Sequence, residues 1–168
     1  MARVVENMLF RRFEPKQKRL FLMQIDGIPA YLVHVSARPK FSFGVGEIHH
    51  INTYFKYKGK VSWESITINL YDPIEESGML AVYQWVLSHH DPTSGRDGYQ
   101  DVYKKNIQLL LLDPQGTVIE QWTLHGAWVS SIDPDNLDFA NTSDFLDISL
   151  TINFDYATLD FSASPEPA

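Results

Sequence analysis

Apolar and polar side chains alternate along several stretches of this chain, and this period of two restricts the folds open to it. Ile66, Ile68 and Leu70 are separated by polar residues, and apolar residues occupy every second position from 148 to 156. Successive side chains of a β-strand point to opposite faces of the sheet, whereas a helix has a longer repeat. Both stretches therefore predict half-buried strands.

Turn signals divide the rest of the chain into further strands. Strands are predicted over residues 20–26, 30–37, 45–57, 61–71, 104–112, 117–128 and 146–161. Turns are predicted at 27–29, 58–60 and 113–116, where Gly, Pro or charged residues gather. We expect the first two strands to form a hairpin, and likewise the strands on either side of 113–116. About eight antiparallel strands predict a mainly β fold, a closed or nearly closed β-barrel or sandwich with one flanking α-helix.

That helix is predicted to begin directly after residue 72. Asp72 suits the N-cap, Pro73 the first helical position, and Glu75 completes the spacing of a capping box. The apolar face is predicted from residues one helical turn apart, namely Met79, Val82, Tyr83 and Val86. Asp91-Pro92 ends the helix, and Gly78 inside it costs about 1 kcal/mol relative to alanine.

Length and composition fit a single domain. A chain of 168 residues buries roughly 70% of the surface that its unfolded form exposes. Residues 1–19 mix apolar and basic side chains and are interpreted as an N-terminal arm. Residues 20–161 form the predicted β domain, and 162–168 a flexible C-terminal tail.

The chain contains no cysteine, which excludes disulfides, thiolate catalysis and zinc–thiolate sites. Its longest apolar run, 109–112, is far shorter than the roughly 20 residues that span a bilayer, and its start does not resemble a signal peptide. We therefore expect no membrane insertion of the subunit.

Candidate catalytic and metal-binding groups are better explained by structure. His49 and His50 are adjacent on a predicted strand, so they point to opposite faces and cannot share an ion. Glu47 shares a face with His49, but two ligands fall short of a zinc site. Gly44-Val45-Gly46 lacks the third glycine of a dinucleotide-binding loop. We expect no enzymatic activity, no cofactor and no bound metal.

The segment 45–63 carries an excess of large apolar side chains on an extended stretch. Those expected to contact another subunit are Val45, Ile48, Ile51, Tyr54, Phe55, Tyr57 and Trp63. Contiguous exposed apolar surface normally marks a binding site. The alternating aromatic and basic residues at 54–58 would also suit nucleotide stacking, but we favour packing against a neighbouring subunit.

Charge is distributed unevenly along the chain. Residues 1–105 hold all 14 Lys and Arg and 11 acidic residues, whereas residues 106–168 hold 10 acidic residues and no basic ones. This skew indicates either a solvated acidic face or a surface that repels polyanions, and both disfavour a sequence-tolerant nucleic-acid binder. The candidates for acidic residues of a lumen or surface are Asp113, Glu120, Asp133, Asp135, Asp138, Asp144, Asp147, Asp155 and Asp160.

The order of features over about residues 20–160 resembles the tail tube proteins of contractile-tailed bacteriophages. Related proteins are the pyocin tube proteins and the haemolysin-coregulated tube proteins of type VI secretion. The matching segments are 62–72, 83–86, 103–105, 111–116, 122–128 and 148–156. Val129 departs from the pattern, which has proline after the aromatic residue, and this affects the shape of the following loop.

The resemblance implies a structural subunit of the virion, made in the host bacterial cytoplasm. Subunits of this family form hexameric rings, whose strands join into one inner sheet, and the rings stack into a hollow tube. The implied partners are further copies of the chain, the tail sheath protein, and the baseplate and tail terminator proteins. DNA passes through the lumen without specific binding. The segment 45–63 matches the arm through which subunits and rings meet.

Other functions remain open at this point. The chain could form the tube of a pyocin-like or type VI secretion apparatus instead of a phage tail. From a different class, it could be a monomeric β-barrel that binds a small apolar ligand, or a barrel enzyme with a cofactor, which the missing phosphate and nucleophile motifs disfavour.

Overall fold

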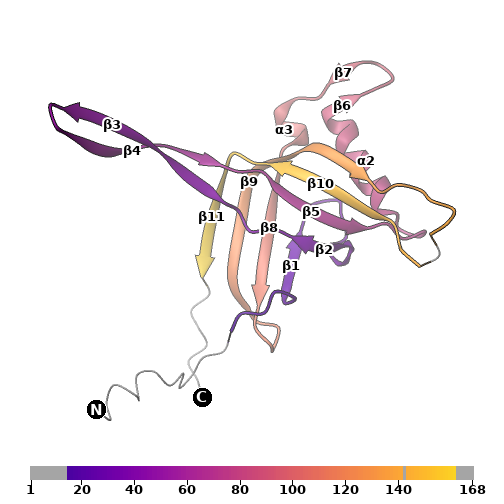
Figure 1. The fold of residues 1–168 in the computed structure, drawn as a ribbon. Coiled ribbons are helices and arrows are strands. Elements are labelled where there is room, and N and C mark those ends of the chain that lie inside the picture. Colours follow the sequence, from indigo (N-terminus) through magenta and orange to yellow (C-terminus); the bar gives the residue numbers. More distant parts are fainter. Residues whose placement is uncertain (1–14, 142, 162–168) are drawn as a thin grey trace, which may run out of the picture.

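The computed structural model describes residues 15–141 and 143–161, and most of its strands form one antiparallel sheet (Figure 1). The seven strands of this sheet are β1 (Phe21–Gln24), β2 (Val33–Ser36), β5 (Ile66–Tyr71), β8 (Lys105–Leu112), β9 (Val118–Pro134), β10 (Asp147–Asn153) and β11 (Tyr156–Phe161). They follow the order β1-β8-β9-β10-β5-β2, and β11 pairs with β9. The expected mainly β, antiparallel fold is confirmed.

The remaining elements lie outside this sheet. β3 (Phe41–His50) pairs with β4 (Thr53–Trp63), and β6 (His90–Asp91) with β7 (Arg96–Asp97). The helical segments are η1 (Ala30–Leu32), α2 (Gly78–His89) and α3 (Gln100–Tyr103). In the described part of the chain, no helix has the length and apolar character needed to cross a membrane.

The long strand β9 curls the sheet around the core. Its first part pairs with β8 on one side and β11 on the other, and its second part pairs with β10. A register shift near Ile152 and a positive φ of 64° at Gly126 mark where the strands bend. The curl brings β1 and β2 together, where the Ser36 hydroxyl donates to Met23 Sδ at 3.4 Å. Within the described residues these two strands share no ladder, so the barrel is nearly closed.

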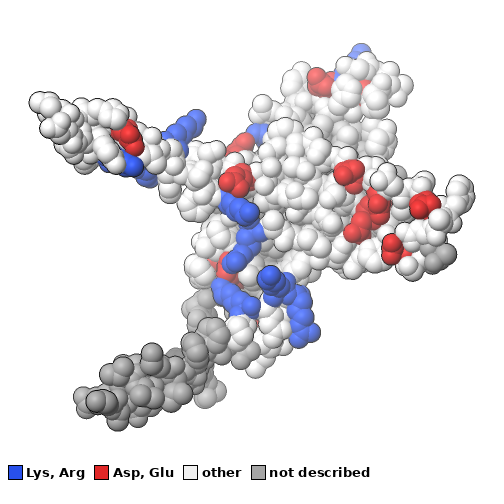
Figure 2. Space-filling view, in the orientation of Figure 1, with Lys and Arg blue, Asp and Glu red and all other residues white. Residues whose placement is uncertain are grey.

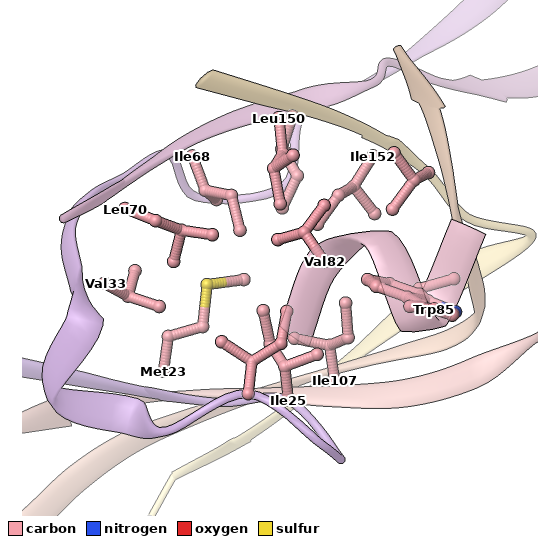
Figure 3. Close-up of a cluster of buried hydrophobic side chains, with 14 of the residues drawn as sticks. Met23, Ile25, Val33, Ile68, Leu70, Val82, Trp85, Ile107, Leu150 and Ile152 are labelled. Carbon is pink, nitrogen blue, oxygen red and sulfur yellow. The ribbon is translucent and has the colours of Figure 1, made fainter. Parts of the chain in front are cut away.

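Helix α2 closes one end of the barrel and adds to its core (Figure 3). Val82 and Trp85 point between the strands and are buried, and the Trp85 indole donates to the Tyr103 carbonyl oxygen at 2.8 Å. The alternating positions of β5 and β10 face the same core, as expected from the sequence. Those fully or almost fully buried are Ile66, Ile68, Leu70, Ile148, Leu150 and Ile152. Each such side chain contributes roughly 1.5–3 kcal/mol of burial free energy.

The predicted start of the helix was wrong. α2 begins at Gly78, and Ser77 is its N-cap, with its hydroxyl accepting from the Leu80 amide at 3.4 Å. Asp72 instead supports this cap by accepting from the Ser77 hydroxyl at 2.8 Å and from the Met79 amide at 3.2 Å. Residues 73–76 are needed to turn the chain away from β5, so they cannot be helical.

The predicted apolar face of the helix needs one correction. Met79, Val82 and Val86 pack on the core as expected, but Tyr83 is exposed. Trp85 takes its place, because the buried stripe is centred on Val82 and Trp85, one turn apart.

One prediction about strand pairing was also wrong. β1 pairs with β8 and β2 with β5, and the segment between β1 and β2 forms only the bridge Ile25–Ile28. These strands occupy opposite edges of the sheet before its curl brings them together, so they cannot form a hairpin. A register shift between Val33 and Val35 leaves Val33 buried and Val35 exposed. The hairpin of β8 and β9 is confirmed, with the Gly116 amide donating to the Asp113 carbonyl oxygen at 3.0 Å.

Candidate functional site

The hairpin of β3 and β4 projects from the barrel as an arm (Figure 1). Within the described residues neither strand pairs with any strand but the other. At the base, the Trp63 ring lies 5.0 Å from the Phe41 ring and 5.7 Å from the core residue Phe154, measured between centroids. Trp63, one of the predicted contact residues, therefore joins the arm to its own subunit.

The arm folds differently from the predicted extended segment with a turn at 58–60. Its turn is at Ile51-Asn52, and Gly59 and Lys60 lie within β4 as a bulge opposite Gly44. The backbones approach so closely here that a Cβ on Gly59 would lie 2.9 Å from the Gly44 carbonyl oxygen. The two glycines thus permit a bulge within a longer hairpin instead of a turn.

One face of the outer arm is apolar. Residues directly opposite each other in an antiparallel pair share a face, and the register pairs Ile48 with Phe55 and Gly46 with Tyr57. The Tyr57 ring covers Gly46, where a Cβ would lie only 2.2 Å from the ring. Ile48 is 57% exposed and Phe55 67%. We call these four residues the apolar face of the arm.

The opposite face is charged. The Glu47 carboxylate lies 3.4 Å from Lys56 Nζ and 3.9 Å from His49 Nε2, so Glu47 and His49 share a face as predicted. Lys56 Nζ also lies 5.1 Å from the centroid of the Tyr54 ring. The predicted contact residues are therefore divided, since Val45 and Tyr54 belong to this charged face.

Ile51 lies at the tip of the arm and is 95% exposed. A two-stranded hairpin alone is marginally stable in water, and large apolar side chains held away from a core favour a partner. The arm is therefore the candidate functional site, and its chemistry is that of binding rather than catalysis.

The free edge of the main sheet offers a second surface for association. Of the described strands, β11 pairs only with β9, so its other edge presents unpaired backbone groups. Tyr156 and Phe161 at its two ends are exposed. Such an edge is a template for adding another strand.

A row of uncharged polar residues crosses the outward face of this part of the sheet, beside Leu22 and Leu110. The register places Gln24, Gln108, Thr123 and Thr158 in one row across β1, β8, β9 and β11. Met23 and Leu109, their neighbours along the strands, are buried, so this row faces outward. Of the nine candidate acidic residues, Asp160 lies on this face, two residues along β11 from Thr158.

Glu120 is the candidate that the structure places in the interior, and its expected surface position was wrong. It is 3% exposed and accepts hydrogen bonds from Lys16 and, at 2.6 Å, from the Trp122 indole. The Arg38 guanidinium lies 3.8 Å away. Burial raises the pKa of Glu120. The hydrogen bonds from Lys16 and Trp122 and the nearby positive charges lower this pKa by a larger amount, so the net shift is downward.

Two other candidate carboxylates have local partners. Asp155 forms an ion pair with Lys104 at 2.9 Å. Asp113 accepts from the amides of Gln115 and Thr117 at 2.9 and 2.8 Å and so stabilises the turn between β8 and β9. These two acidic groups are therefore explained by local structure.

The remaining candidates gather at the end of the barrel beside the loop joining β9 to β10 (Figure 2). Asp133, Asp135, Asp138 and Asp144 are exposed, and Asp147 is half-buried with an oxygen 3.3 Å from His34 Nε2. We call the described residues of this loop, 135–141 and 143–146, the acidic loop.

Basic residues surround a pocket between the start of the described chain and the sheet. Lys16, Lys18 and Arg38 form its polar part, and Leu20, Phe21, Leu109 and Leu111 its apolar part, around a volume of about 380 Å³. We call it the basic pocket.

Comparison with known proteins gives matches at the level of structure. No protein-family model and no curated protein matches the sequence. A chain in the tube-terminating cap of the anti-feeding prophage has a TM-score of 0.74 and 18% identity, covering 92% of this chain and 96% of that one. A chain in the sheath–tube complex of the extracellular contractile injection system PVC, in its extended state, has a TM-score of 0.70 and 17% identity, covering 94% and 97%.

A chain in the sheath/tube terminator of the same system has a TM-score of 0.72 and 18% identity, covering 89% of this chain and 99% of that one. These likenesses establish the fold. It is the fold of chains found in contractile injection particles, and this confirms the resemblance to tube proteins seen in the sequence.

Proposed function

We propose that this chain is a non-catalytic structural subunit of the inner tube of a contractile particle. Copies form hexameric rings, as the resemblance implies, and the rings stack into a hollow tube enclosed by a sheath. The observation that carries this proposal is the projecting arm, which holds an apolar face away from the subunit's own core.

The arm supports assembly energetically. Burying a side chain such as Ile48 or Phe55 against a neighbour contributes roughly 1.5–3 kcal/mol each, before the cost of association is subtracted. An arm that reaches from one subunit to another gives a head-to-tail contact, which generates closed rings or open filaments. The free edge of β11 supports a second contact, in which strands of adjacent subunits continue one sheet.

The outward face with Gln24, Gln108, Thr123 and Thr158 is our candidate for the wall of the channel. Uncharged amides and hydroxyls would neither attract nor strongly repel a polyanion, and Asp160 would make the wall weakly acidic. A cargo would then slide without specific binding. The acidic loop lies apart from this face. The acidic residues concentrated in the second half of the chain therefore do not line the whole channel and serve another purpose.

The particle is a phage tail that ejects its genome or an injection apparatus with another cargo. The likeness to chains of the anti-feeding prophage and of an extracellular contractile injection system favours the second. A chain that ends the tube, rather than building its length, is a further candidate, because two of the similar chains come from a tube-terminating cap and a sheath/tube terminator.

The proposal is tested by size-exclusion chromatography with light scattering and by negative-stain microscopy of the purified chain. We expect rings or tubes with a central channel. Rings that never stack would indicate a terminal position. A compact monomer at high concentration would contradict the proposal and favour the ligand-binding barrel.

A further inference from the structure

The acidic loop carries large apolar side chains that nothing in the described chain covers. Leu137 is 85% exposed and Phe139 is completely exposed, and Asp138 lies between them. An apolar residue beside carboxylates on an exposed loop is poorly suited to remaining in water. The combination suits insertion into an apolar pocket with a basic rim.

The basic pocket has this character. Its apolar side is formed by Leu20, Phe21 and Leu109, and its volume of about 380 Å³ exceeds what one aromatic side chain requires. Lys16 is paired with Glu120, and Arg38 lies farther from the same carboxylate, at 3.8 Å, with its side chain 64% exposed. Lys18 is exposed. Lys18 and Arg38 are therefore the positive groups available to a second molecule.

The two surfaces lie on different parts of the molecule. The acidic loop joins β9 to β10 at one end of the barrel, whereas the pocket lies beside β1, near where the described chain begins (Figures 1 and 2). Acidic residues gather at the first place, and basic residues run toward the second (Figure 2). Because the loop cannot reach the pocket of its own chain in this fold, the partner that supplies the matching surface is another copy.

We infer that the acidic loop of one subunit docks in the basic pocket of a second copy of this chain. Phe139 enters the apolar part of the pocket, and Asp138 faces Lys18 and Arg38. The contact joins different surfaces of the two copies, so it repeats from subunit to subunit. The inference rests on the proposed function and deepens it by naming one pair of surfaces through which the subunits assemble.

The absence of cysteine from the chain allows a direct test by cross-linking. A variant carrying Lys18→Cys and Asp138→Cys, treated with a short bismaleimide, should give a ladder of covalent multimers on a denaturing gel. Mixing the two single variants should give dimers and no longer products. The matched control carries Lys18→Cys with Ile74→Cys, since Ile74 is as exposed as Phe139 but lies outside the loop, and should give no ladder.

Two further measurements test the chemistry of the contact. Adding Phe139→Ala to the double-cysteine variant should reduce the rate of multimer formation about tenfold, as expected for loss of a central aromatic anchor. In the wild-type chain, which keeps Asp138 and Lys18, association measured by light scattering should weaken when salt is raised from low ionic strength to about 1 M, where the Debye length is about 3 Å. Circular dichroism of each variant would check that the fold is retained.

Four outcomes would overturn the inference. Three are a cross-link within one monomer, dimers from the Asp138→Cys variant alone, and rings or tubes that form without any cross-linking between the two sites. A ladder that appears only after residues 162–168 are deleted would also overturn it, because the chain's own tail would then be the occupant. Rings that form without cross-links would contradict the inferred contact but leave the proposed function intact. A ladder from a protein that forms neither rings nor tubes would support the contact and contradict the proposed role in a tube.

Discussion

Glu120 accepts a hydrogen bond of 2.6 Å from the indole nitrogen of Trp122, its neighbour two residues along β9. Residues two apart in a strand share a face, so this carboxylate points inward with the tryptophan. Lys16 and Arg38 lie on its other side and supply positive charge. The segment before β1 is thereby fastened to the middle of the sheet by a buried acid.

This arrangement predicts a dependence of stability on pH. The folded-state pKa of Glu120 is lowered from its ordinary value of 4.5, so its contribution to stability is fully present above about 4.5 and is lost as pH falls through the lower folded pKa. Urea unfolding midpoints measured between pH 6 and pH 3 should fall at the acidic end. Glu120→Gln should be less stable at pH 6 and show a smaller further loss on acidification, whereas the matched exposed acid Asp160→Asn should follow the wild type. Equal pH profiles for Glu120→Gln and wild type would contradict this assignment.

The apolar face of the arm predicts where assembly can be blocked. Phe55→Asp should leave a folded subunit that no longer forms rings or tubes, because a charge would be buried at the contact. Ile51→Asp at the tip should act in the same direction. Microscopy and light scattering measure assembly, and circular dichroism measures the fold. Tyr54→Asp, on the charged face, is the matched control and should impair assembly less, so an equal loss would show that the face is wrongly assigned.

At Gly78, helix propensity predicts the wrong direction for the change in stability on substitution by alanine. Alanine is favoured over glycine inside a helix by about 1 kcal/mol. At Gly78, however, a Cβ would lie 2.6 Å from the Tyr71 carbonyl oxygen, a backbone atom of β5. Gly78→Ala should therefore destabilise the protein by about 1–3 kcal/mol in urea unfolding. Gln84→Ala, exposed in the same helix, should change stability by less than about 0.5 kcal/mol.

The uncharged sheet face predicts how assembled tubes treat duplex DNA. Wild-type tubes should not retain it, whereas Thr123→Lys with Thr158→Lys should give tubes that bind duplex with a steep salt dependence. Filter retention at several salt concentrations measures this. Gln84→Lys with Ser130→Lys adds the same charge at exposed positions elsewhere and should bind less. Strong binding by wild-type tubes would contradict the proposed channel wall.

Removal of metal ions is predicted to have no effect. The chain has no cysteine, and among the described residues no group of three His, Asp or Glu side chains is placed to hold an ion. Dialysis against a chelator should change neither the melting temperature nor assembly. A reproducible loss of several degrees that one metal restores would refute this prediction.

Much of the fold could be predicted from local pattern. The alternation in 66–70 and 148–154 identified the strands of the core and the side chains they bury. The turn at Asp113 to Gly116 was also local, because it depends on a carboxylate capping its own backbone and on a glycine with φ of 87°. Such features need no information from distant parts of the chain.

Features that depend on distant contacts were missed. Asp72 carries the N-cap signal of a helix, but the helix begins at Gly78 because β5 and α2 must first separate and then pack. Glycine at 59 indicates a turn, and only the opposing glycine at 44 makes it a bulge in a longer hairpin. Neither pairing can be read from one segment alone.

The sequence by itself determined which residues would be apolar, charged or alternating, and hence a mainly β domain with an apolar segment available for assembly. Only the tertiary structure decided which side chains lie opposite one another and which are buried. It paired Ile48 with Phe55 across the arm, and it buried Glu120 while leaving Asp138 in solvent. The physical reason is that residue type fixes the free energy of transfer from water, whereas strand pairing between distant segments fixes the environment to which each side chain is transferred.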